Sequence, residues 1–110
     1  MRFDFRYALV AAALAVPAHC GKFKFCKEVG WVNCNEFDNV QTARCYNLGA
    51  EWNKTCSSAR SYGGISCYMW SYPNCMGKSA GPVLDNTRYR DLSQFGMDNE
   101  SSSWECYASL

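Results

Sequence analysis

The chain has 110 residues, and its 11 lysines and arginines against 10 aspartates and glutamates give a formal net charge of +1. This balance argues against a general nucleic-acid binder, which shows a basic excess, and against a cationic membrane-lytic protein. Eight cysteines in so short a chain indicate instead a small exported domain stabilised by disulfides.

The first 18 residues have the pattern of a signal peptide. Arg2 and Arg6 precede an unbroken apolar run over residues 7–15, and small residues follow at 16–18. The run is shorter than the roughly 20 apolar residues that span a bilayer, so we expect export with cleavage before His19. A buried N-terminal helix is the alternative. A bacterial lipoprotein is less favoured, because a histidine precedes the first cysteine.

Removal of this leader makes the chain neutral. It takes away two positive charges and one negative charge, which leaves nine of each in the mature chain, residues 19–110. We therefore expect a secreted, extracellular, monomeric protein that has no transmembrane segment and binds no nucleic acid.

The mature chain contains all eight cysteines, and this even number predicts four disulfides. A domain of this length buries a modest core, and each bridge adds about 2–4 kcal/mol of stability. A zinc site is disfavoured, because the sequence has a single histidine and no CxxC pair. The expected disulfide cysteines are Cys20, Cys26, Cys34, Cys45, Cys56, Cys67, Cys75 and Cys106.

The mature chain also repeats itself loosely, at an offset of about 41–47 residues. Four pairs of segments match: Cys26 to Cys34 with Cys67 to Cys75, residues 38–39 with 85–86, residues 44–48 with 88–92, and residues 53–58 with 98–103. Two copies indicate one duplicated domain over 19–110, with a first unit at about 22–61 and a second at about 64–110.

Each unit has the composition of β-structure. Aromatic and β-branched residues cluster between glycine-, proline- and asparagine-rich turns, and the segment from residue 104 to 110 alternates. Neither unit could bury its apolar face alone. We therefore predict an all-β sandwich of two Greek-key motifs that pack together.

The ends of the two units carry a recognisable signature, WNKTCSSAR (52–60) and MDNESSSWEC (97–106). Both resemble the βγ-crystallin motif, in which two Asn/Asp residues are followed, after two positions, by Ser/Thr and Ser. The second copy fits throughout, whereas the first has Lys54 at the second Asn/Asp position. Leu48 and Leu92 before the motifs also fit.

The resemblance covers essentially the whole mature chain. It is similar in kind to small secreted cysteine-rich proteins, such as fungal effector candidates, killer toxins and antimicrobial proteins. It implies a βγ-crystallin-like fold, but a fold does not fix a function.

The resemblance also implies weak calcium binding in the two motif loops, through carboxylate, hydroxyl and backbone oxygens. The candidate ligands are Asp98, Asn99 and Ser102 in the second loop, and Asn53 and Ser57 in the first. Lys54 should weaken or remove one site by charge repulsion. The alternative is that these residues only shape the turns. We expect no other cofactor.

The same loops contain two N-glycosylation sequons, at Asn53 and at Asn99. A glycan on Asn99 is hard to reconcile with an occupied calcium site, so the two interpretations compete.

Catalytic patterns find little support. The single histidine, His19, lies at the expected mature N-terminus, so we expect neither a Ser/His/Asp nor a Cys/His arrangement. A carboxylate pair such as Asp98 with Glu100 lies in a turn whose purpose is structural. We expect a protein that is not an enzyme.

The aromatic residues offer a binding surface. Most of the four tryptophans should be in the core, but alternation over 68–73 places large residues on both faces of one strand. An exposed Trp70 or Tyr72 would suit a protein-binding patch or a sugar platform. The alternative is an aromatic cover over a disulfide.

The simplest symmetric disulfide pairing is Cys26–Cys34 and Cys67–Cys75, with the other four cysteines tying the ends and the first unit together. This is one of 105 possible connectivities.

The leading functional hypothesis is a secreted, non-enzymatic, effector- or toxin-like protein that binds a host or competitor protein or a wall polysaccharide. Three alternatives remain: an antimicrobial or killer-toxin protein, a proteinase inhibitor, and a calcium-binding structural protein of a wall or spore coat. The inhibitor would need a rigid exposed loop, for which Ser79-Ala80-Gly81-Pro82 is the candidate.

Overall fold

The computed structural model describes residues 21–109, so the expected leader, the cleavage site and Cys20 lie outside the described residues. Within this range no helix has the length and apolarity needed to cross a bilayer. The elements, in chain order, are β1 (Lys22–Glu28), β2 (Val32–Phe37), β3 (Cys45–Asn47), β4 (Ser58–Tyr62), β5 (Ile65–Tyr72), β6 (Met76–Val83), the 3-10 helix η2 (Leu92–Phe95) and β7 (Ser103–Ala108).

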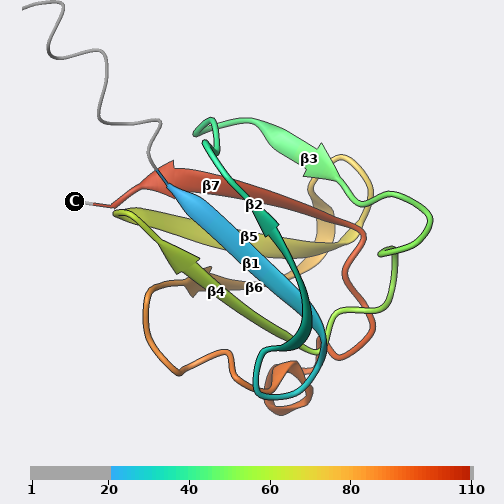
Figure 1. Cartoon of the computed structure of the whole chain (residues 1–110). Coiled ribbons are helices and arrows are strands. Elements are labelled where there is room, and N and C mark those ends of the chain that lie inside the picture. The colour runs from blue at the N-terminus through green and yellow to red at the C-terminus, as the bar shows by residue number, and fades with distance from the viewer. Residues whose placement is uncertain (1–20, 110) are drawn as a thin grey trace, which may run out of the picture.

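The strands form two antiparallel sheets that face each other (Figure 1). One sheet has the order β2-β1-β4 and the other β3-β7-β5-β6. Strand β3 comes from the first half of the sequence yet pairs with β7 of the second half. In return, residues 84–90 run beside β4, where Ala59 N–H donates to Tyr89 O at 3.0 Å. This exchange is that of two interlocked Greek keys, and the predicted all-β sandwich is confirmed.

The core lies between the sheets and is built from alternating strand residues. Phe23 and Phe25 point inward from β1, while the lysines between and beside them point outward. Trp104 of β7 is 2% exposed, with ring centroids 4.7 Å from Phe23 and 4.3 Å from Tyr46. Each such buried side chain contributes roughly 1.5–3 kcal/mol, so this aromatic cluster is a major source of stability.

Two buried serine hydroxyls hold the two halves in the same way. Ser58 Oγ donates to Glu28 O at 2.7 Å and accepts from Trp31 N–H at 3.0 Å. Ser103 Oγ donates to Tyr72 O at 2.6 Å and accepts from Cys75 N–H at 2.9 Å. Each hydroxyl thus fastens the hairpin of its own half to the strand that follows its motif loop.

This symmetry corrects the repeat that the sequence suggested. Trp31 and Cys75 occupy equivalent positions, both with positive φ, at 62° and 56°. Likewise Cys26 O and Trp70 O accept from the equivalent Ser57 and Ser102 N–H groups. The proposed equivalence of Cys26 and Cys34 with Cys67 and Cys75 is therefore wrong, because backbone hydrogen bonds, and not cysteine spacing, set the register of the repeat.

Three disulfides form among residues 21–109: Cys26–Cys34, Cys67–Cys106 and Cys45–Cys75. The expected Cys26–Cys34 bridge is confirmed, and it joins directly opposed residues of β1 and β2. The expected Cys67–Cys75 bridge is wrong. Cys67 is buried opposite Cys106 on β7, whereas Cys75 lies at the β5–β6 turn and bonds to Cys45 of β3.

The fourth expected bridge leaves Cys56 to pair with Cys20, which lies outside the described residues, so this bridge stays a prediction. Within the described part of the chain Cys56 is a free, buried thiol. It lies in the first motif loop, where its carbonyl accepts from Asn99 N–H at 2.9 Å. Desolvation by the surrounding core raises the pKa of this thiol to about 12. Its thiolate is therefore scarce at neutral pH.

We expect Cys56 to resist alkylation in the native protein and to react fully once the protein is unfolded, because the thiolate is the nucleophile. The measurement is iodoacetamide labelling at pH 7.5 without reductant, with and without guanidinium, followed by non-reducing peptide mapping. Labelling of native Cys56 as fast as that of a free cysteine peptide would contradict the burial.

We expect Ser103→Ala to destabilise the protein by about 1–3 kcal/mol, because the substitution leaves Tyr72 O and Cys75 N–H without their buried partner. Urea unfolding measures the effect. Ser79→Ala, at an exposed position of β6, is the matched control. Equal midpoints for the two variants would show that the hydroxyl does not hold the hairpin.

Candidate binding groove and the motif loops

The structure brings the two motif loops together. Lys54 N–H donates to Ser101 O at 2.8 Å, and Asn99 N–H donates to Cys56 O at 2.9 Å. Lys54 and Asn99, at equivalent motif positions, have φ values of 62° and 57°. The left-handed backbone at these positions turns each loop toward the other, so the two halves are joined by main-chain hydrogen bonds.

The side chain of Lys54 adds a second link between the halves. Its ammonium donates to Ser71 O at 2.7 Å and to Glu100 O at 3.1 Å, and it lies 5.7 Å from the centroid of the Tyr72 ring. A positive charge is thus placed among carbonyl oxygens that belong to the second half.

This geometry does not fit a calcium ion at that position. The carbonyl oxygens that a hard cation would need are already hydrogen-bonded to the ammonium of Lys54, whose charge would repel a divalent ion. Lysine is the one departure from the motif, and it acts as a tethered cation in the first loop.

The other candidate ligands are dispersed around the loops. Asn53 and Asn99 are exposed, whereas Ser57 and Ser102 are buried. Asp98 is half-buried, and its Oδ1 is covered and has no hydrogen-bond partner among the described residues. Among residues 21–109, no group of three or more His, Cys, Asp or Glu side chains gathers in one place. Asp98 is therefore the one expected ligand of the two loops that carries a carboxylate.

The two sequon asparagines, Asn53 and Asn99, are both at the surface. Their sequon hydroxyls are turned inward: Thr55 Oγ1 donates to Trp52 O at 2.9 Å, and Ser101 is fully buried. Glycosylation at these positions stays a prediction.

The structure separates the two residues that were expected to form a binding surface. Tyr72 is 61% exposed at the end of β5, whereas Trp70 is half-buried and lines an open groove of about 560 Å³. The groove lies on the outer face of the four-stranded sheet, over β5, β7 and β6. Its lining residues are Ser66, Tyr68, Trp70, Ser79, Tyr107, Ala108 and Ser109.

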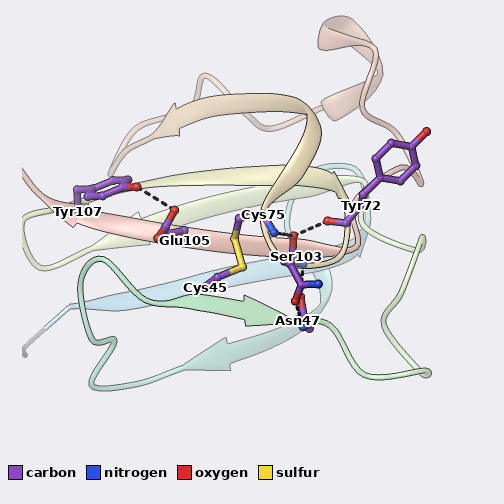
Figure 2. The surroundings of a disulfide bond; sticks show 8 residues. Cys45, Asn47, Tyr72, Cys75, Ser103, Glu105 and Tyr107 are labelled. Atoms are coloured by element: carbon purple, nitrogen blue, oxygen red, sulfur yellow. Dashed lines mark hydrogen bonds between the residues drawn. A yellow bond between two sulfur atoms is a disulfide. The ribbon is translucent and has the colours of Figure 1, made fainter.

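Aromatic rings form much of this groove. Tyr68 of β5 and Tyr107 of β7 meet edge to face, with ring centroids 6.2 Å apart and planes at 70°. The Tyr107 hydroxyl donates to Glu105 at 2.8 Å, and this hydrogen bond raises the pKa of Tyr107 above its ordinary value. Figure 2 shows Tyr107 and Glu105 along β7, well away from Tyr72.

The same face carries a brace that holds the β5–β6 turn against β3. The Cys45–Cys75 disulfide spans the gap, and beside it Asn47 Oδ1 accepts from Asn74 N–H at 2.7 Å (Figure 2). The Ser103 hydroxyl, hydrogen-bonded to the same turn, completes this brace. The groove is therefore built on strands whose mutual positions are fixed at one end.

Sequence reasoning singled out Trp70 but missed Tyr68 and Tyr107 as groove residues. The available signal was the alternation in β5, which places Ser66, Tyr68 and Trp70 on one face. Tyr107 joins them only because β7 pairs antiparallel with β5, with Ser66 opposite Tyr107.

The expected exposed loop at residues 79–82 is wrong. These residues lie within β6, where Ser79 pairs with Trp70 and Ala80 pairs with Met69. Ala80 is 6% exposed, so the segment is part of the sheet and presents no protruding inhibitory loop.

No family model matches the sequence, and neither does any curated protein. Solved structures do match: a βγ-crystallin from an archaeon is 22% identical, with a TM-score of 0.58 over 78% of this chain and 96% of that one. The fold is that of a βγ-crystallin domain.

Two further solved structures support this assignment. A βγ-crystallin domain of Flavobacterium johnsoniae is 22% identical, with a TM-score of 0.59 over 78% of this chain and 93% of that one. The βγ-crystallin domain of Abundant Perithecial Protein from Neurospora crassa, in its Ca²⁺-bound form, is 12% identical, with a TM-score of 0.63 over 83% and 92%.

We expect Lys54→Asp to gain a calcium response that the unsubstituted protein lacks at this position, because the tethered ammonium is replaced by a carboxylate. Without calcium the variant should unfold at a lower temperature, since Ser71 O and Glu100 O lose their partner. Added calcium should recover part of that loss. Thermal unfolding with EGTA or with millimolar calcium measures both effects.

Lys78→Asp, at an exposed position of β6, is the charge-matched control and should respond to calcium as the unsubstituted protein does. An equal calcium shift in all three proteins would contradict the assignment of Lys54 as a tethered cation.

Proposed function

We propose that this protein is a secreted, non-enzymatic binding protein that acts on a component of a host or competitor organism. The observation that carries the proposal is the aromatic groove on the outer face of the four-stranded sheet. A concave site with aromatic walls and a few polar groups is the usual form of a ligand-binding site.

Export is supported by two independent features. The first 18 residues have a charged start, an apolar run and a small-residue exit. The domain is closed by three disulfides, which persist in oxidising compartments. A protein with both features is expected outside the cell.

Binding, and not catalysis, is supported by the chemistry of the groove. The described residues that line it supply hydroxyl groups, aromatic rings and one indole, and none of them carries a carboxylate, imidazole or thiol. The Asp98 and Glu100 carboxylates lie in the motif loop, whose backbone joins the two halves. Their place in the fold supports a structural role.

Three observations favour this function over the alternatives. A neutral mature chain does not favour a cationic antimicrobial protein. The segment expected to act as an inhibitory loop is paired within β6. Lys54 occupies the cation position in the first motif loop, which does not favour a calcium-dependent structural protein.

We expect the fluorescently labelled mature protein to bind saturably to intact cells or walls from at least one member of a panel of fungal, bacterial and plant cells. The double variant Tyr68→Ser/Tyr107→Ser should bind at least tenfold more weakly, a loss of about 1.4 kcal/mol, because it removes two groove walls. Circular dichroism checks that the variant is folded.

Tyr72→Ser is the matched control, since it removes an exposed tyrosine of the same strand outside the groove, and it should bind as the unsubstituted protein does. Growth of the same cells, measured in parallel, distinguishes a toxin from a protein that binds without affecting growth. Absence of saturable binding across the panel, or equal loss in both variants, would overturn the proposal.

A further inference from the structure

We infer that the groove binds a neutral glycan, with sugar rings against its aromatic side chains and sugar hydroxyls against its serines. This inference rests on the proposed function and names the class of ligand that the groove takes.

The ring arrangement suits a ligand made of successive flat units. Tyr68 and Trp70 are two residues apart on one face of β5, which separates their positions by about 7 Å along the strand. Tyr107 reaches the same groove from β7, 6.2 Å from Tyr68 between ring centroids. Aromatic faces carry negative charge, and the C–H groups of a pyranose ring present weakly positive hydrogens to them.

The polar groups of the groove are the uncharged ones that sugar hydroxyls pair with. Ser66 and Ser109 hydroxyls lie 2.6 Å apart, and each keeps further capacity to accept a hydrogen bond. Ser79 adds an exposed hydroxyl from β6.

The charge pattern sets this ligand apart from others. None of the described lining residues is charged, so nothing there neutralises a phosphate or a carboxylate. The Glu105 carboxylate on the same face is already engaged by the Tyr107 hydroxyl. A nucleic acid or an acidic glycan would therefore bring uncompensated charge, and a lipid chain would leave the serine hydroxyls unpaired.

A bound peptide strand is also disfavoured by position. Ser66, Tyr68 and Trp70 lie on β5, whose backbone is already paired with both β6 and β7. An extended peptide gains affinity by pairing with a free sheet edge, and β5 offers none to it. A ligand without a linear array of amide groups fits better.

The test is isothermal titration of the mature protein with chitohexaose, cellohexaose and laminarihexaose, and with an oligogalacturonate as the anionic probe. We expect saturable binding of at least one neutral hexasaccharide and none of the anionic probe. Tyr107→Ala should weaken binding at least tenfold, and Tyr107→Phe, which keeps the ring, should lose less. Tyr72→Ala, outside the groove, should leave it unchanged.

The outcomes separate this inference from the proposed function. If the groove variant loses cell binding but the protein binds none of the neutral glycans, the glycan assignment is overturned. The groove would then bind a protein partner. Equal affinity for the anionic probe, or equal loss in Tyr72→Ala and Tyr107→Ala, would also overturn it. Failure of both the cell-binding and the glycan experiments would remove the groove as the functional site.

Discussion

The fold depends on the main-chain pairing of the two motif loops. Lys54 N–H with Ser101 O, and Asn99 N–H with Cys56 O, cross-link the two halves just before β4 and β7 begin. The left-handed conformation at Lys54 and Asn99 makes this approach possible. Ser58 and Ser103, the last residues of the two motifs, then donate hydrogen bonds to the hairpin of their own half. Each motif loop therefore joins the two halves and also holds the hairpin of its own half.

The binding groove follows from this arrangement. Because Ser103 fixes β7 against the end of β5, Tyr107 at the other end of β7 is brought beside Tyr68. The Cys45–Cys75 bridge then ties the β5–β6 turn to β3 on the same face. A site formed by side chains from paired strands is held more rigidly than one on a loop, which reduces the ordering cost of binding.

Lys54 shows how one substitution changes the chemistry of a motif without changing its fold. The backbone at this position keeps the left-handed turn that Asn99 has in the second loop. Its long side chain carries the ammonium to Ser71 O and Glu100 O, where it supplies an internal positive charge. The ammonium of Lys54 thereby stabilises the first motif loop, whereas the second motif loop carries the carboxylates of Asp98 and Glu100.

The sequence by itself determined the β-sandwich class and the duplication, because alternation and motif spacing are local signals. The Cys26–Cys34 bridge was expected from a cysteine repeat that is wrong, and it forms because these residues are opposed in the β1–β2 hairpin. The tertiary structure alone decided the Cys45–Cys75 and Cys67–Cys106 bridges and the groove. These depend on β3 joining the opposite sheet and on the β5–β7 register, which bring together residues 30 or more positions apart. Short-range patterns carry no record of such pairing. Trp70 could therefore be singled out as a binding residue, but its partner Tyr107 could not.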